Sequence, residues 1–468
     1  MSAHLLTDWR PDDATFWAAS GHRVAARNLW ISIPALLLAF SVWMVWSVVV
    51  AKLPSIGFAY TTTQLFWLAA LPGLSGATLR IFYSFMVPIF GGRLWTTLST
   101  ASLLIPAVGI GFAVQNPQTP YVVFLILALL CGFGGGNFAS SMANISFFFP
   151  KAEKGNALAL NAGLGNLGVS VMQFVVPLAI TSGGFAIGSA QPTAAGGQLF
   201  LQNAGFVWVP FLVVSTLAAW FGMDDLAAAK ASFAEQAIIL KRAHNWLMCV
   251  LYTGTFGSFI GYSAGFPLLM KIEFPEVDAL RYAFLGPLVG ALSRAGTGWI
   301  SDRFGGGRVT FWTFLGMIAA VGGVLFFLGI KTEPGAFWGF FASFMVLFFL
   351  TGVGNASTFQ MIPAIMRKEV TRLMPELKGE TLVRQAERES AAIIAFTSAI
   401  AAYGAFFIPS AYGVSIASTG GPQAALEAFA IFYAVCVVVT FVFYTRRGGL
   451  LHDVERALTA ASRSTPTA

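Results

Sequence analysis

The sequence predicts an all-α membrane protein whose twelve transmembrane helices form two pseudo-symmetric halves of six. Two observations support this fold class. The 468 residues are 57% hydrophobic and only 10% charged, a composition typical of a polytopic membrane protein. A polar segment also divides the apolar runs six from six. We therefore predict an N-terminal half at residues 1–222, a central cytoplasmic loop at 223–245, and a C-terminal half with a short cytoplasmic tail at 246–468.

Twelve apolar stretches define the predicted spans, each close to or longer than the ~20 residues that a helix needs to cross the hydrocarbon core. They lie near residues 30–52, 64–90, 93–114, 120–149, 156–182, 205–222, 246–269, 281–301, 309–330, 336–363, 390–414 and 428–445. The longer stretches predict helices that are tilted or that extend into the membrane interface.

The basic residues predict the orientation of these spans. With both termini in the cytoplasm, the inner loops and tails hold 21 of the 27 lysines and arginines, including those of residues 230–242 and 367–388. The outer loops hold only 4. This bias follows the positive-inside rule. The orientation of the spans therefore explains the net charge of +7, and we expect membrane lipid and no nucleic acid as partner.

The two remaining basic residues, Arg80 and Arg294, lie within spans. Each precedes a Phe-Gly-Gly sequence by ten residues, which is about 15 Å along a helix and half of a ~30 Å hydrocarbon core. A charge at that depth costs about 2.5–3.5 kcal/mol on insertion scales, and such residues are functional candidates. No acidic residue lies in the same helices at comparable depth. The expected partner is an anionic substrate.

The two halves also repeat in sequence. The matching pairs are GAxxR at 76–80 and 290–294, FGG at 90–92 and 304–306, and, with one residue slipped, GxGNxxS at 134–140 and GxGNxS at 352–357. Parallel internal repeats are typical of transporters, whose substrate sites lie near the midplane between the halves. The repeat makes the second and eighth helices equivalent, and it predicts that their arginines face each other across a central cavity.

The loop after the eighth span, residues 298–308, contains Asp302 and Arg303 and resembles the loop signature of the major facilitator superfamily. The equivalent loop at 90–93 is degenerate and lacks the acidic residue. The resemblance implies that this segment helps to lock the halves at the cytoplasmic face. The alternative is an ordinary turn with positive-inside charges.

Glycines and asparagines are concentrated in three spans. Gly163, Gly165 and Gly168 in the fifth helix and Gly352 and Gly354 in the tenth are predicted to serve gating or close helix packing. Among them lie amides that are costly in hydrocarbon unless bonded and that can donate hydrogen bonds to an oxyanion: Asn137, Asn144, Asn161, Asn166 and Asn355.

Three strings resemble the nitrate/nitrite porters (NarK type) of the major facilitator superfamily: SGATLRIFYSF at 75–85, AGLGNLG at 162–168 and TGVGNASTFQM at 351–361. The resemblance covers nearly the whole chain. It implies that Arg80 and Arg294 clamp the anion and that Asn166 donates a hydrogen bond to it. It further implies that Tyr252, Phe138 and Phe256 line the site, with Asn355 among the gating or packing residues.

The chemistry of the site agrees with such a substrate. Nitrate and nitrite are small planar anions whose oxygens match the planar donor fork of a guanidinium group. An aromatic lining favours flat ions over tetrahedral phosphate or sulfate. We therefore expect an inner-membrane transporter of nitrate assimilation, monomeric and without a cofactor.

The absence of protonatable groups in the spans predicts the coupling mechanism. The predicted spans contain no carboxylate and no histidine, and Glu427 lies at the outer rim of the last span. Two arginines repel each other in an empty cavity, and a bound anion lowers the excess charge from +2 to +1. A carrier that closes only when loaded must exchange one anion for another. We therefore favour nitrate/nitrite antiport; the alternative is nitrate/proton symport, which the family also contains.

Other protein classes fit less well. An ion channel does not require the two-half repeat, and the tail after Tyr444 is too short for a signalling domain. Cys131, Cys249 and Cys436 all fall in apolar segments, and the four histidines lie outside the predicted spans. No nucleophile–base pair or metal cluster is visible, so we expect neither an enzyme nor a metal site.

Overall fold

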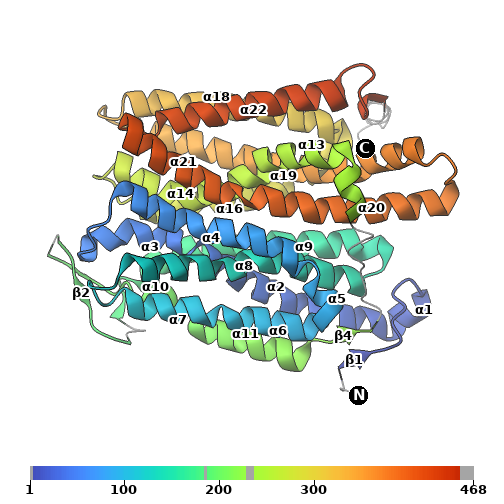
Figure 1. The fold of residues 1–468 in the computed structure, drawn as a ribbon, viewed down its shortest axis with the longest axis horizontal. Coiled ribbons are helices and arrows are strands. Elements are labelled where there is room, and N and C mark those ends of the chain that lie inside the picture. Colours follow the sequence, from blue (N-terminus) through green and yellow to red (C-terminus); the bar gives the residue numbers. More distant parts are fainter. Residues whose placement is uncertain (1–3, 184–186, 195, 228–236, 454–468) are drawn as a thin grey trace, which may run out of the picture. The chain divides into compact units, whose positions relative to one another are not determined.

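The computed structural model describes residues 4–183, 187–194, 196–227 and 237–453 (Figure 1). Lys230 of the central loop and the end of the tail, residues 454–468, lie outside this range. The chain divides by its contacts into two units. The first comprises Met1–Ala231, Ser263–Leu288 and Ala405–Ala417, and the second comprises Ser232–Tyr262, Val289–Gly404 and Ser418–Ala468. The sequence halves at 1–222 and 246–468 remain a prediction from the repeat.

Residues 4–227 form helices joined by short connections. The helices are α1 (Ala14–Phe16), η1 (Trp17–Gly21), α2 (His22–Met44), α3 (Trp46–Lys52), η2 (Leu53–Ile56), α4 (Thr62–Tyr83), α5 (Met86–Phe90), α6 (Gly92–Ser102), α7 (Leu104–Ala113), α8 (Tyr121–Phe148), α9 (Lys151–Ala179), α10 (Asn203–Phe206) and α11 (Val209–Gly222). Two pairs of short strands accompany them: β1 (Leu5–Leu6) is parallel to β4 (Asp225–Leu226), and β2 (Gln191–Pro192) is antiparallel to β3 (Gln198–Leu199).

Residues 237–453 are also helical. Their helices are η4 (Ala237–Lys241), α13 (Ala243–Tyr252), η5 (Thr253–Gly257), α14 (Ser258–Glu273), α15 (Leu280–Ala283), α16 (Leu285–Gly296), α17 (Gly298–Phe304), α18 (Gly306–Gly329), α19 (Ala336–Leu373), α20 (Gly379–Ala402), α21 (Gly404–Thr419), α22 (Gln423–Thr440) and η6 (Phe441–Thr445).

Every predicted span is helical. In the described part of the chain, ten helical segments are long and apolar enough to cross a membrane. The two other predicted spans consist of shorter pieces. The π-helix Thr253–Gly257 lies within the span at 246–269, and the span at 281–301 is divided among α15, α16 and α17. π-Helical turns are frequent at functional sites.

Three helices run beyond the predicted spans and bring carboxylates with them. α19 continues to Leu373 and α20 begins at Gly379, so Glu369 and Glu389 lie in helices and are buried. Glu273, also buried, ends α14. The predicted spans themselves contain no carboxylate, but the helices that carry three of them extend past these bounds to buried carboxylates. Hydropathy marks where the hydrocarbon ends, whereas backbone hydrogen bonding continues past that point.

The buried carboxylates on α19 and α20 are paired with arginines. Arg242, which precedes α13, donates from Nε and Nη2 to the two oxygens of Glu389, each at 2.7 Å. Arg372 Nη2 lies 3.0 Å from Glu369 Oε1. Bidentate, charge-assisted bonds of this kind offset the cost of burying a carboxylate. The hydrogen bonds to Glu389 also raise the pKa of Arg242 above its usual value.

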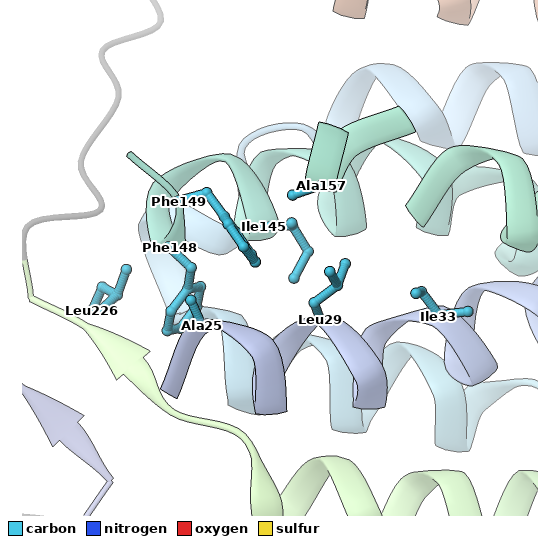
Figure 2. Close-up of a cluster of buried hydrophobic side chains, with 8 residues drawn as sticks. All are labelled: Ala25, Leu29, Ile33, Ile145, Phe148, Phe149, Ala157 and Leu226. Carbon is cyan, nitrogen blue, oxygen red and sulfur yellow. The ribbon is translucent and has the colours of Figure 1, made fainter. Parts of the chain in front are cut away.

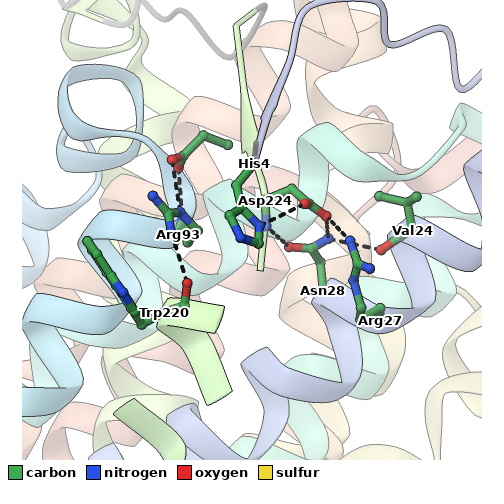
Figure 3. Close-up of polar contacts among 8 residues, drawn as sticks. His4, Val24, Arg27, Asn28, Arg93, Trp220 and Asp224 are labelled. Atoms are coloured by element: carbon green, nitrogen blue, oxygen red, sulfur yellow. Dashed lines mark hydrogen bonds and ion pairs between the residues drawn. The ribbon is translucent and has the colours of Figure 1, made fainter. Parts of the chain in front are cut away.

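The N-terminal segment is bonded to the residues that follow α11 (Figure 3). Asn28 and Asp224 exchange two hydrogen bonds, from Asn28 Nδ2 to a carboxylate oxygen at 3.0 Å and from the backbone N–H of Asp224 to Asn28 Oδ1 at 2.9 Å. Arg27 forms an ion pair with the same carboxylate. The residues just before the first predicted span and those just after the sixth therefore lie on one side of the first unit, as an even number of crossings requires.

A hydrophobic cluster covers the same end of the helices (Figure 2). Its members come from α2, α8, α9 and the segments beside them, and they are Ala25, Leu29, Ile33, Ile145, Phe148, Phe149, Ala157 and Leu226. Burial of such side chains contributes about 25 cal/mol for each Å² of apolar surface. The cluster fixes the ends of the helices that carry Phe138 and Asn166.

The two Phe-Gly-Gly sequences adopt the same backbone conformation. Gly91 has φ +87° and Gly305 has φ +91°, values that residues with a Cβ rarely adopt. Each glycine stands between two helices, α5 and α6 in one case and α17 and α18 in the other. The sequence repeat is therefore matched by a structural repeat at these turns.

Candidate functional site

Arg80 and Arg294 each lie in the last turn of a helical segment. α4 ends at Tyr83 and α16 ends at Gly296. The carbonyl groups at the C-terminus of a helix carry a partial negative charge, which stabilises a nearby cation. The two helix ends therefore offset part of the cost of placing an arginine at this depth.

Arg80 is completely buried, with 0% of its surface exposed. Its Nε donates to the backbone carbonyl of Gly135 on α8 at 3.0 Å. The guanidinium carbon lies 4.8 Å from the centre of the Phe138 ring and 5.3 Å from that of Trp43. The structure thus brings together Arg80 and Phe138, two of the predicted site residues, and cation–π attraction stabilises the buried charge.

Asn166 lies on α9 and is 1% exposed. Neither Oδ1 nor Nδ2 has a hydrogen-bond partner among the residues that the structure describes. Asn161, one turn earlier, donates instead to Ser141 Oγ at 2.8 Å and so joins two helices. A buried amide without partners costs about 1–3 kcal/mol. Of these two asparagines, Asn166 is the one suited to bind a substrate.

Arg294 lies in a different environment from that of Arg80. It is half-buried, and its guanidinium carbon is 5.6 Å from the ring centre of Phe359 on α19. Phe359 also lies 6.0 Å from the ring of Tyr252. Tyr252 in turn stacks on Phe256, with ring centres 5.5 Å apart and planes 16° from parallel. Phe359 therefore connects Arg294 to Tyr252, and Tyr252 in turn contacts Phe256.

Two residues of these environments were not predicted from the sequence: Trp43 and Phe359. Phe359 belongs to the string at 351–361 that carried the family resemblance. Trp43 has no such signal, since it is one of 13 tryptophans in an apolar chain.

The predicted glycines differ in their surroundings. A Cβ on Gly168 would overlap the carbonyl oxygen of Leu37, and one on Gly165 would come within 2.6 Å of the Leu36 side chain. Gly352 and Gly354 likewise leave no room, because Ser293 and Thr255 lie against them. These four positions permit close helix packing. A Cβ on Gly163 would have no neighbour within 4 Å among the described residues, and the gating role of this glycine remains a prediction.

The remaining predicted residues lie on α17 and α19. Asp302 and Arg303 are exposed on α17, and the Arg303 guanidinium lies 5.5 Å from the ring of Phe304. Asn355 is 1% exposed, and its Oδ1 has no partner in the described range. Within the described part of the chain, no hydrogen bond joins Asn355 to a predicted binding residue.

The degenerate loop at 90–93 obtains its acidic partner from elsewhere in the first unit. Asp225 accepts a hydrogen bond from the backbone N–H of Arg93 at 2.8 Å and lies 3.5 Å from Arg93 Nε. The carboxylate that the loop itself lacks is therefore supplied by β4. The same carboxylate would meet a Cβ on Gly91, so this glycine is needed for the contact as well as for its φ.

No cluster of three or more His, Cys, Asp or Glu side chains that would suit a metal ion occurs in the described parts of the chain. All three cysteines are buried and form no disulfide. The predicted site residues in the described range are arginine, amide and aromatic groups.

Comparison with known proteins identifies the family. The model of the Major Facilitator Superfamily matches residues 32–379. The chain is 53% identical to the nitrate/nitrite transporter NarU of Escherichia coli, over 95% of this chain and 97% of that one. It is 42% identical to the probable nitrate/nitrite antiporter NarK2 of Thermus thermophilus, with the same coverage.

Among solved structures, the nucleoside transporter NupG is similar with a TM-score of 0.60 and 10% identity, over 88% of this chain and 98% of that one. At this identity the likeness shows the fold alone. Together, these matches confirm the predicted twelve-helix membrane fold and the resemblance carried by residues 162–168 and 351–361. They also identify the relatives as transporters, not enzymes. The chain therefore belongs to the Major Facilitator Superfamily and, within it, to the family of the nitrate/nitrite transporters.

Proposed function

We propose that this protein carries nitrate and nitrite across the bacterial inner membrane by exchanging one anion for the other. The observation that carries the proposal is the complete burial of Arg80 in a membrane span, against the faces of Trp43 and Phe138. Ionisable residues inside membrane spans are rare and are functional candidates by default. The 53% sequence identity to NarU over nearly the whole chain supports nitrate and nitrite as the substrates.

The donors around Arg80 suit a small planar oxyanion. The guanidinium group presents parallel N–H bonds that match two oxygens of nitrate or nitrite. Asn166 adds an amide donor without adding charge. Phe138 supplies an aromatic face, and aromatic faces stack on flat groups. In the proposed site, Arg80 and Asn166 donate hydrogen bonds and Phe138 limits the thickness of the bound ion.

We assign Arg294, Tyr252 and Phe256 to the same anion on the basis of the sequence repeat. The repeat makes Arg294 the counterpart of Arg80, at the end of the equivalent helix. Two arginines with one monovalent anion carry an excess charge of +1 in place of +2. Closure of the carrier is then favoured only in the loaded state. A carrier that must return loaded performs exchange, and this supports antiport over the nitrate/proton symport alternative.

Replacement of each arginine by lysine tests the proposal. Arg80→Lys and Arg294→Lys keep the charge but lose the bidentate donor fork. We expect each variant to lose at least about tenfold in nitrate affinity, the equivalent of one charge-assisted hydrogen bond. The measurements are nitrate binding to purified protein and nitrate uptake into proteoliposomes. Arg281→Lys is the control, because the Arg281 side chain is 76% exposed. Near wild-type affinity in a correctly inserted Arg80→Lys or Arg294→Lys variant would remove that arginine from the site.

A further inference from the structure

Trp43 occupies a space that three glycines leave open. Methyl groups on Gly76 and Gly135 would come within 2.5 Å and 2.8 Å of the indole Nε1, and one on Gly134 within 3.2 Å of the Trp43 Cβ. Gly76 lies on α4, one turn before Arg80, and the other two lie on α8. The glycines of the GAxxR and GxGN repeats in this half therefore serve to admit an indole ring between two helices.

The indole ring of Trp43 is held in place by a hydrogen bond from its Nε1 and by a ring contact. Its Nε1 donates to the carbonyl of Pro72 on α4 at 2.7 Å. Its ring packs edge-on against Phe40, with centres 5.4 Å apart, and the side chain is 0% exposed. A buried tryptophan whose N–H is bonded has little freedom to rotate. The ring face is thus a rigid support.

The supported group is the guanidinium of Arg80. Trp43 and Phe138 each lie within cation–π distance of it, at 5.3 and 4.8 Å, and Gly135 accepts the hydrogen bond from Nε. With Nε bonded to a backbone carbonyl, the plane and direction of the guanidinium are set by α8 and Trp43. The terminal nitrogens lie in this plane, so its orientation decides how they meet the oxygens of an anion.

The second half has a different arrangement. The glycine equivalent to Gly76, Gly290, packs against the ring of Phe259. A phenylalanine has no N–H to anchor it. Arg294 is half-buried and is 5.6 Å from the ring of Phe359. The support of the arginine by an anchored indole is therefore a feature of the first half.

We propose that Trp43 is a positioning residue for substrate binding, which holds the Arg80 guanidinium in the orientation that receives the anion. This inference rests on the proposed function, because it gives Trp43 a role only if Arg80 binds nitrate. Trp43 acts through Arg80, with no contact of its own to the anion required. The clamp then consists of one preorganised arginine in the first half and a less constrained arginine in the second.

The test compares Trp43→Phe with Trp46→Phe. Trp46 is also completely buried and lies one turn further along, but it packs against Phe124 at 5.7 Å. Trp43→Phe keeps an aromatic face and loses the bond to Pro72. We expect nitrate affinity to fall about three- to tenfold, the equivalent of one neutral hydrogen bond, with little change in the maximal exchange rate. Trp46→Phe is expected to leave nitrate affinity unchanged at a similar loss of thermal stability.

Arg80→Lys provides the background that separates positioning from general stability. In that background, Trp43→Phe is expected to cause no further loss of affinity, because the oriented fork is already absent. An equal further loss in the Arg80→Lys background, or equal affinities of Trp43→Phe and Trp46→Phe, would overturn the positioning role while leaving the clamp intact. If Arg80→Lys itself binds nitrate normally, the proposed function fails instead. The two failures are thus distinguishable.

Discussion

At the scale of single residues, Asn166 has surroundings that helix packing does not explain. It is buried on α9, and neither end of its amide is bonded within the described residues. Asn203, also buried, donates to the carbonyls of Ala179 and Ser182 at 3.0 and 2.9 Å. The contrast identifies Asn203 as a structural amide and Asn166 as one whose partner is expected to be the substrate.

This contrast leads to a prediction for the two amides. A hydrogen bond to a charged partner contributes about 1.5–3 kcal/mol, so Asn166→Ala should weaken nitrate binding by roughly one to two orders of magnitude. Its thermal stability should change little. Asn203→Ala is the matched control, and it should lose stability with unchanged nitrate affinity. Titration of nitrate against purified protein and a melting curve measure both quantities. Unchanged affinity in Asn166→Ala would assign this residue to packing.

The aromatic residues show how far the site could be predicted. Phe138 and Tyr252 were predicted through the family resemblance, and the structure places them beside Arg80 and Phe359 respectively. Trp43 could not be predicted, because its role depends on glycines of two other helices. A sequence pattern shows that a residue is apolar, but it does not show which helix it faces.

At the scale of helices, the glycines of α9 divide into two kinds. Gly168 lies where α9 approaches α2 closely, and its Cα faces the Leu37 carbonyl. Gly163 faces open space within the described part of the chain. The two positions look alike in the sequence, since both belong to AGLGNLG. Only the packing partner distinguishes them.

Alanine substitution tests this division. Gly168→Ala should separate α9 from α2 and lower stability by roughly 1–3 kcal/mol, the usual cost of overpacking. Gly163→Ala should leave stability unchanged or raise it slightly, because alanine favours a helix. Thermal unfolding of both proteins in the same detergent provides the comparison. Equal destabilisation would contradict the packing account. If Gly163→Ala slows transport at unchanged stability, its predicted gating role is supported.

The extent of the helices was predictable only in part. All twelve apolar stretches are helical, and ten of them coincide with helical segments of the described chain that are long and apolar enough to cross a membrane, because hydropathy reports directly on contact with hydrocarbon. The extensions of α19 and α20 were not predicted, since they depend on ion pairs such as Arg242 with Glu389 that lie far apart in sequence. The division of the seventh span by a π-helix at Thr253–Gly257 has no signal in hydropathy either.

At the scale of the whole molecule, transport requires the two ends of the carrier to open in turn. Gln173 on α9 donates to Ser47 Oγ at 3.1 Å and to the carbonyl of Ser263 on α14 at 2.7 Å. Ser170 donates to the carbonyl of Phe284 at 2.9 Å. All of these residues belong to the first unit, and the predicted topology places them toward the outer side. The bonds to Ser263 and Phe284 join residues of the predicted N-terminal half to residues of the predicted C-terminal half, and we expect these bonds to break when the outer side opens.

Removal of these bonds should favour an outward-open state. The one Gln173 bond that joins the predicted halves, to Ser263, contributes about 0.5–1.5 kcal/mol, so Gln173→Leu should raise the outward-open population roughly two- to tenfold. A cysteine introduced at Phe284 should then react faster with a membrane-impermeant maleimide. Gln202→Leu is the control, because Gln202 donates to the carbonyl of Ser189 and accepts from Gln191, all within the predicted outer loop. Equal labelling rates in the two variants would show that Gln173 does not hold the outer side closed.

The coupling of transport also concerns the whole molecule. In the nitrate/proton symport alternative, Glu369 is a specific candidate for the group that binds the proton. It is buried and paired with Arg372, and His244 Nε2 lies 3.7 Å from its other oxygen. A proton symporter would need a group of this kind to bind and release a proton. Under antiport, Glu369→Gln alters neither the dependence on internal nitrite nor the response to a proton gradient.

Counterflow in proteoliposomes, at clamped pH and membrane potential, tests nitrate/nitrite exchange most directly. Nitrite trapped inside should accelerate the entry of labelled nitrate in a saturable manner, and an inward proton gradient without an internal anion should have little effect. Exchange of two monovalent anions moves no net charge, so the membrane potential should have little influence either. Steady accumulation of nitrate in nitrite-free vesicles, driven by the proton gradient and accompanied by external alkalinisation, would contradict antiport and establish symport in its place.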